Sequence, residues 1–203
     1  GRVASAALAL PQADGRVALL GHSMASDIIV RQARADPRIG ATVAISMFSQ
    51  AVTAEAPKNL LMISGAWESF LREDSLRNLR LANRSADEGS TVGTPESPGG
   101  IRRAVVAPGV EHVGVLYSAT ALGEARAWLD TVFGRTSAGP VTATGGGIVL
   151  LLTGIVLLAW ILARLLPAGT APPDDVPLRA FALAVFVPAV VTPLLLAQID
   201  TRF

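Results

Sequence analysis

The chain contains no cysteine and only two histidines among its 203 residues. Disulfide bonds and thiolate metal sites are therefore excluded, although the absence of cysteine leaves the redox compartment open. Two histidines are also too few for most zinc sites unless carboxylates complete the ligand set. We accordingly expect neither a metal ion nor an organic cofactor.

The chain also lacks an excess of charge of either sign. It has 17 Lys and Arg residues against 16 Asp and Glu residues, which gives a formal net charge of +1 at pH 7. The arginines are spread along the chain rather than clustered. A protein that binds nucleic acid needs a basic face for the phosphates, so we expect no nucleic acid partner.

Apolar residues are abundant, at 51% of the chain, and the mean hydropathy is +0.48. The excess is local, because residues 145–163 and 180–199 contain no charged side chain. Roughly 20 helical residues cross a hydrocarbon core about 30 Å thick, so each segment is long enough to span a membrane. We expect a transmembrane hairpin within residues 148–203, with a polar turn at residues 164–179. Two buried core helices are the alternative, but a small domain has little apolar surface to cover them.

Neither apolar segment has an ionisable group at its centre, which a proton path or an ion site would need. We therefore interpret the segments as an anchor, with the first helices of a larger polytopic domain as the alternative. Pro188 and Pro193 in the second segment are tolerated in membrane helices. The flanking arginines are balanced, two on either side, so the side of the membrane stays open. We expect a multi-pass protein of the bacterial inner-membrane type.

Upstream of a flexible linker at residues 136–147, short apolar runs alternate with amphipathic stretches. The runs predict buried strands at residues 17–20, 41–49, 57–65 and within 101–112, and the stretches predict helices at residues 3–10, 25–35, 69–86 and 118–133, with a loop at 87–100. Strands that alternate with helices imply a parallel sheet covered on both faces. We therefore expect an α/β domain at residues 1–135.

The stretch "VALLGHSMAS" places Ser23 directly after a predicted strand and at the start of a predicted helix. Small neighbours allow a sharp turn that exposes the serine, and the backbone N–H of Met24 can then face a developing oxyanion. The pattern is similar to G-x-S-x-G, with Ala25 in place of the commoner glycine. A helix N-cap is the alternative role for the serine. His22 lies within the turn, and we expect its side chain to point elsewhere.

Two further polar residues follow predicted strands. Glu68 comes just after the third strand, and His112 comes in the loop after the fourth. The carboxyl ends of neighbouring parallel strands meet at one edge of an open sheet, so Ser23, Glu68 and His112 should converge there. A single histidine or glutamate in a loop is usually solvated. Three such residues in the order nucleophile, acid and base rarely coincide by accident.

Three stretches together resemble one enzyme family. "ALLGHSMAS", "PKNLLMISGAWE" and "VVAPGVEHVG" are similar to the nucleophile elbow, the strand before the acid and the histidine loop of α/β-hydrolases of the lysophospholipase or serine-aminopeptidase type. The resemblance covers residues 1–135 and implies the last four strands of that fold with their helices. It also implies that Ser23 attacks a carbonyl, that His112 transfers the proton, and that Glu68 orients His112.

The acid is the point at which the chain departs from the family pattern, since the family usually has aspartate where this chain has Glu68. Glu111, beside His112, is less well placed for the same role. So are Glu73 and Asp74, on the helix that follows.

The resemblance and the apolar segments together imply a membrane-anchored serine hydrolase that cleaves an ester, a thioester or an amide. The substrate would be a small molecule or a lipid-like acyl compound, and the membrane is the expected partner. The fold alone does not choose among these substrates. The alternative function is a non-catalytic, hydrolase-like binding module of a polytopic membrane protein.

The hydrolase family has about four strands before the elbow strand, and this chain, which begins at Gly1, has no room for them. We therefore expect a fragment, with residues 17–20 at an exposed sheet edge. The second oxyanion donor comes from the other half of the family fold, and losing one such donor costs on the order of 10²–10³ in rate. We predict that the 203-residue chain alone is inactive, although the complete protein is an enzyme. Serine-dependent turnover of an ester by this chain would contradict the prediction.

Overall fold

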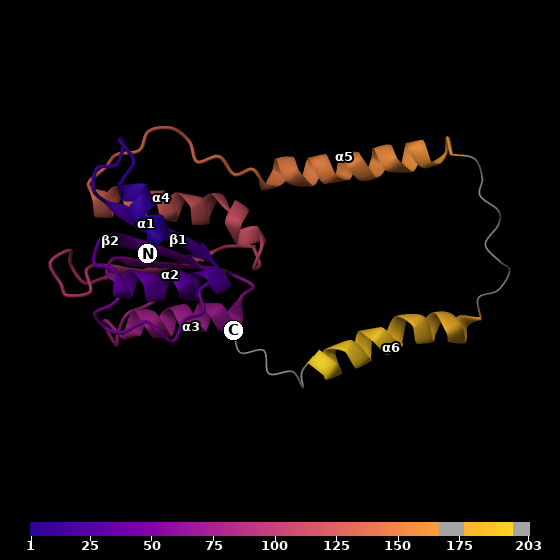
Figure 1. Cartoon of the computed structure of the whole chain (residues 1–203), viewed down its shortest axis with the longest axis horizontal. Coiled ribbons are helices and arrows are strands. Elements are labelled where there is room, and N and C mark those ends of the chain that lie inside the picture. Colours follow the sequence, from indigo (N-terminus) through magenta and orange to yellow (C-terminus); the bar gives the residue numbers. More distant parts are fainter. Residues whose placement is uncertain (167–176, 197–203) are drawn as a thin grey trace. The chain divides into compact units, whose positions relative to one another are not determined.

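A computed structural model describes residues 1–166 and 177–196 of the chain (Figure 1). Its elements are α1 (Arg2–Leu8), β1 (Val17–His22), α2 (Met24–Ala35), β2 (Ile39–Ile45), β3 (Leu60–Gly65), α3 (Ser69–Arg80), β4 (Thr91–Val92), β5 (Arg102–Ala107), the 3-10 turn η1 (Gly114–Tyr117), α4 (Ala119–Phe133), α5 (Gly145–Ala163) and α6 (Leu178–Leu196). Contacts divide the chain into two units, Gly1–Leu152 and Thr153–Phe203, and α5 crosses the boundary.

The five strands form one sheet in the order β1-β2-β3-β5-β4. The four longer strands are parallel, as the sequence predicts, and the α/β class is confirmed. The expectation of a purely parallel sheet is wrong, because β4 pairs antiparallel with β5. This strand lies within residues 87–100, where the composition predicts only a loop. Two residues are too few to produce a periodic pattern.

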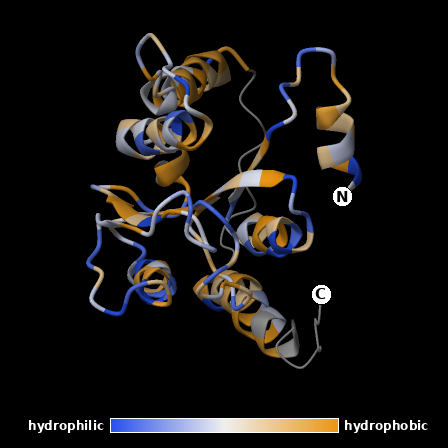
Figure 2. Cartoon of the chain, turned by 90° about the vertical axis from the view of Figure 1, so that its left-hand side faces the viewer, coloured by the Kyte–Doolittle hydropathy of each residue, from blue (hydrophilic) through white to orange (hydrophobic). Residues whose placement is uncertain are grey.

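Apolar side chains of the central strands alternate between the two faces of the sheet, which gives each face its own core. The core on the side of α2 and α3 includes Ala44, Met62 and Ala104, and the core on the side of α4 includes Val43, Ile63 and Val105. Figures 1 and 2 show α2 and α3 on one face of the sheet and α4 on the other. Coverage of both faces explains why β2 and β3 are continuous apolar runs.

β1 lies at the edge of this sheet and pairs with β2 along one side. The prediction of a sheet edge at residues 17–20 is thereby confirmed. Leu20 on this strand is 57% exposed, although it is a large apolar side chain. An edge strand presents N–H and C=O groups that can pair with a further strand.

The parallel strands end in register. His22 is opposite Ile45, Ile45 is opposite Ile63, and Ile63 is opposite Val105. The residues that follow these positions therefore lie along one rim of the sheet. This rim carries the candidate site.

α5 has 19 residues and no buried side chain, and by length and composition it could cross a membrane. Among the described residues it is the one helix that meets both criteria. α6 has 19 residues and contains Pro188, and Leu178–Thr192 is the apolar stretch found within its described residues. One helix among the described residues could thus span a membrane, and the predicted transmembrane hairpin is not confirmed.

The predicted linker and the predicted polar turn differ in how far the structure describes them. α5 begins at Gly145, so the glycines predicted to end the linker at residues 136–147 belong to the helix. Most of the predicted polar turn, residues 167–176, lies outside the described residues, as does the end of the second predicted span, residues 197–199.

We predict that Trp128→Ala lowers the free energy of unfolding by about 3–5 kcal/mol, because it removes the largest side chain of the core beneath α4. Trp128 is 4% exposed, and its indole N–H donates to the carbonyl of Asn59 at 3.2 Å. Trp67→Ala is the matched control, since Trp67 is 71% exposed, and its effect should stay within about 0.5 kcal/mol. Chemical denaturation followed by circular dichroism measures both. Equal losses in the two variants would contradict this assignment of the core.

Candidate active site

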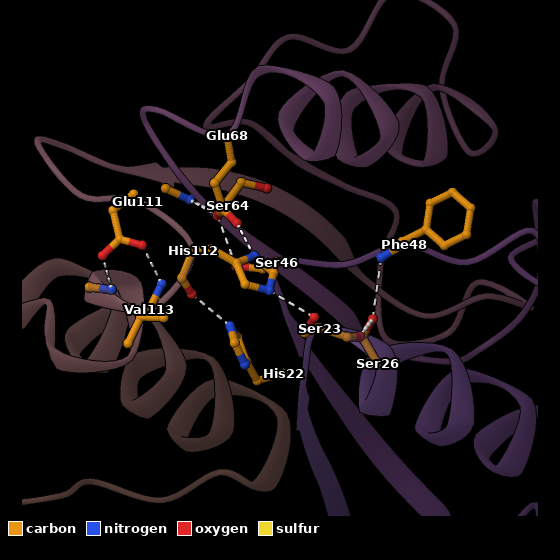
Figure 3. A network of polar contacts seen from close by, with 12 residues as sticks. His22, Ser23, Ser26, Ser46, Phe48, Ser64, Glu68, Glu111, His112 and Val113 are labelled. Atoms are coloured by element: carbon orange, nitrogen blue, oxygen red, sulfur yellow. Dashed lines mark hydrogen bonds and ion pairs between the residues drawn. The ribbon is translucent and has the colours of Figure 1, made fainter. Parts of the chain in front are cut away.

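Ser23 occupies the sharp turn between β1 and α2. Its backbone has φ 55° and ψ −127°, a conformation that residues other than glycine rarely adopt. Ser23 stands at the N-cap position of α2, but its hydroxyl makes no capping hydrogen bond. The hydroxyl oxygen instead lies 2.8 Å from Nε2 of His112 (Figure 3). Capping of α2 therefore does not explain why a serine stands at this position.

Close backbone packing holds the turn in place. Gly21 allows β1 to approach α2, because a Cβ at this position would lie 2.9 Å from the carbonyl oxygen of Ala25. The Ser23 amide donates to the carbonyl of Ile45 at 2.9 Å, which ties the turn to β2. Met24 opens α2, where the first N–H groups of a helix have no intrahelical acceptor. The Met24 amide can therefore serve an external oxygen.

Glu68 is buried at the start of α3, and both of its carboxylate oxygens are in use. Oε1 lies 2.5 Å from Nδ1 of His112, and Oε2 accepts from the amide of Gly65 at 2.6 Å and from the hydroxyl of Ser46 at 2.8 Å. An ionised carboxylate only accepts hydrogen bonds, so Nδ1 of His112 is the donor. Nε2 is then the acceptor in the neutral ring and can take the proton of the Ser23 hydroxyl.

The loop that carries His112 joins β5 to η1 and is fastened by its own backbone. The Glu111 carboxylate accepts from the amides of Val113 at 2.7 Å and Gly114 at 2.8 Å. These backbone hydrogen bonds hold the pKa of Glu111 below its usual value. Gly65 allows the loop to cross the end of β3, since a Cβ there would lie 2.5 Å from the carbonyl oxygen of Val110.

The other predicted acids serve different contacts. Asp74 is buried within α3, where it pairs with Arg77 and accepts from Asn78 at 3.0 Å, and burial raises its pKa. Glu73 lines a surface cavity along α3. Glu111 binds its own loop, as described above. Among the acids considered from the sequence, the structure brings Glu68 to the histidine.

Two residues of the site differ from the sequence-based expectations. His22 was expected to point away from Ser23, and the structure adds a contact that was not foreseen, because its Nε2 lies 2.7 Å from the backbone carbonyl of His112. Ser46 falls within the predicted strand 41–49, whereas β2 ends at Ile45 and Ser46 begins the turn with φ 49°. No sequence signal marked Ser46, because it lies within an apolar run that predicts one continuous strand. No sequence pattern indicated the direction of His22.

Several large apolar side chains that lie within two residues of Ser23, Ser46, Glu68 or His112 in the sequence are exposed. They are Met24, Phe48, Trp67, Phe70 and Val113, which we call the apolar rim. The rings of Phe48 and Phe70 pack against each other with centroids 5.8 Å apart. Large apolar side chains that stay exposed together are typical of surfaces that bind apolar ligands or partners.

Within residues 1–166 and 177–196, no group of three or more His, Cys, Asp or Glu side chains is arranged to hold a metal ion. Comparison with known proteins gives no match to any protein-family model, curated protein or solved structure. The geometry of the site is therefore the basis for an assignment of function.

We predict that Ser23→Gly is more stable than Ser23→Ala by about 1 kcal/mol, because only glycine is relaxed at the positive φ of this turn. Ser26 lies inside α2 and provides the matched control. There the order should reverse, since alanine is favoured over glycine by about 1 kcal/mol in a helix. Thermal unfolding of the four purified variants gives both differences. A preference for alanine at both positions would show that the turn carries no strain.

Proposed function

We propose that the protein is a serine hydrolase of the α/β-hydrolase type, which cleaves an ester, a thioester or an amide. One observation carries the proposal: the hydrogen-bonded series from Ser23 Oγ to His112 Nε2, at 2.8 Å, and from His112 Nδ1 to Glu68 Oε1, at 2.5 Å. A hydroxyl, an imidazole and a buried carboxylate in this order are the groups that activate a serine nucleophile. The resemblance of the three sequence stretches to that family supports the same assignment.

In the proposed reaction, the Ser23 hydroxyl attacks the substrate carbonyl while Nε2 of His112 takes its proton. Glu68 stabilises the imidazolium that forms, because its Oε1 already accepts from Nδ1. The Met24 amide, at the N-terminus of α2, donates to the oxyanion. His112 then protonates the leaving group, and water releases the acyl group from Ser23 by the same steps in reverse order.

In the α/β-hydrolase family a second oxyanion donor comes from a loop in the other half of the fold, whose strands pair beside the elbow strand. The edge of β1 is the place where such strands would pair in this protein. In the proposed mechanism, a loop between those strands provides the second donor. This assignment is consistent with the prediction that the 203-residue chain does not turn over substrate.

The backbone of Ser23 favours a functional site over a purely structural role. A residue in a rare conformation costs on the order of 1–3 kcal/mol, and such residues concentrate at functional sites. A scaffold gains nothing from this cost. The Ser23 hydroxyl does not cap α2. A purely structural role therefore explains neither the rare backbone conformation of Ser23 nor the hydrogen bond of its hydroxyl with His112.

We further propose a membrane location and an acyl substrate that is apolar. α5 serves as a membrane anchor by length and composition, and α6 would complete a hairpin of the bacterial inner-membrane type. The apolar rim supports a substrate with a hydrocarbon portion, because its exposed side chains belong to the segments that carry the site residues. Any small acyl compound with such a portion fits this description.

We predict that a fluorophosphonate probe labels the full-length protein at Ser23 and that Ser23→Ala abolishes the label. His112→Ala should reduce labelling to background, since no base remains to take the proton. Glu68→Gln keeps the shape of the acid but disfavours the required tautomer, and should slow labelling on the order of 10⁴-fold. Peptide mass spectrometry locates the modified residue, and the rate of labelling is followed in a gel.

Glu73→Gln is the matched control for Glu68→Gln, because Glu73 is the neighbouring acid on α3 that has no contact with His112. Its labelling rate should equal that of the unaltered protein. Absence of label from folded, full-length protein would contradict the enzyme and favour the binding module.

A further inference from the structure

His22 is the last residue of β1 and contacts the loop of His112 from the side of the nucleophile. Its Nε2 lies 2.7 Å from the backbone carbonyl oxygen of His112. A carbonyl oxygen only accepts, so Nε2 of His22 is protonated and donates. The bond therefore joins the strand of the nucleophile to the backbone of the proposed base.

The two imidazole rings also touch. Their centroids are 4.7 Å apart and their planes are tilted by 45° (Figure 3). The His112 side chain is 43% exposed, so besides the hydrogen bonds of its two nitrogens only part of the ring is packed against protein. The His22 ring supports one side of it. His22 thus restrains both the backbone and the ring of the same residue.

Apart from the pair of His112 Nε2 and Ser23 Oγ, two further sets of hydrogen bonds hold this loop, and they lie away from the nucleophile. The Glu111 carboxylate binds amides of the loop itself, and the Trp67 amide donates to the carbonyl of Val110 at 3.2 Å. These contacts fix the loop to itself and to the end of β3. The contact from His22 fixes it to β1, one residue before Ser23.

We infer that His22 is a positioning residue for the proposed reaction: its N–H holds the backbone of His112 so that Nε2 of His112 stays within hydrogen-bond distance of Ser23 Oγ. The inference rests on the proposed function. A displacement of about 1 Å in such a pair can cost on the order of 10²-fold in rate. One hydrogen bond from the residue next to the nucleophile opposes that displacement.

The test compares four variants of the full-length protein by the rate at which a fluorophosphonate probe labels Ser23. Gln and Met at position 22 are nearly equal in size, but only Gln has an N–H donor. Phe keeps an aromatic ring without the donor, and Ala removes both. We expect His22→Gln to label within about threefold of the unaltered protein, and His22→Met, His22→Phe and His22→Ala to label more slowly by tenfold or more.

Thermal unfolding of the same variants separates positioning from a merely structural role. A structural role predicts that labelling falls in proportion to stability and that Gln rescues no better than Met. Positioning predicts that Gln and Met unfold at similar temperatures but label at rates that differ by tenfold or more. If His22→Phe fails to fold, the comparison of Gln with Met still decides the matter.

The outcome also distinguishes this inference from the proposed function. Labelling of the unaltered protein at Ser23, with equal rates in His22→Gln and His22→Met, would overturn the role of His22 and leave the hydrolase intact. Failure of the unaltered protein to label would overturn the hydrolase, and the positioning role with it.

Discussion

The hydrogen bond between the Glu68 carboxylate and Nδ1 of His112 is the interaction on which the site depends. It decides which ring nitrogen carries the proton, and so makes Nε2 an acceptor that faces the Ser23 hydroxyl. The carboxylate is itself held by the Gly65 amide and the Ser46 hydroxyl, so its orientation does not depend on the histidine alone. The arrangement requires strands that end level with one another, which the parallel register provides.

Much of the sheet could be predicted because a strand covered on both faces must be apolar throughout. This pattern identified β2 and β3, and the alternation with helices indicated that the long strands run parallel. It could not identify β4, whose two residues pair with β5 only because the chain returns to the sheet. The second apolar segment was predicted to span a membrane, and this stays a prediction, because the described residues of α6 include only part of that segment.

The convergence of Ser23, Glu68 and His112 could be anticipated from strand ends that share one rim, without any knowledge of side-chain directions. Ser46 and His22 could not, for two different reasons. Ser46 continues an apolar run, and only the positive φ of its backbone reveals that the strand has already ended. The contact of His22 depends on where the loop after β5 crosses the rim. That path is set by Gly65 and the hydrogen bonds of Glu111, which lie far from His22 in sequence.

The passage of the histidine loop over Gly65 has a mechanical consequence. The backbone contact at Val110, the amide of Trp67 and the carboxylate of Glu68 unite the ends of β3 and β5 into a single stiff piece. The serine belongs to a second piece, formed by β1 and α2. The pair of hydroxyl and imidazole joins these two pieces, and the bond from His22 to the carbonyl of His112 crosses the same boundary. A shift between the pieces would therefore strain both of these bonds while the pairing of imidazole and carboxylate survives.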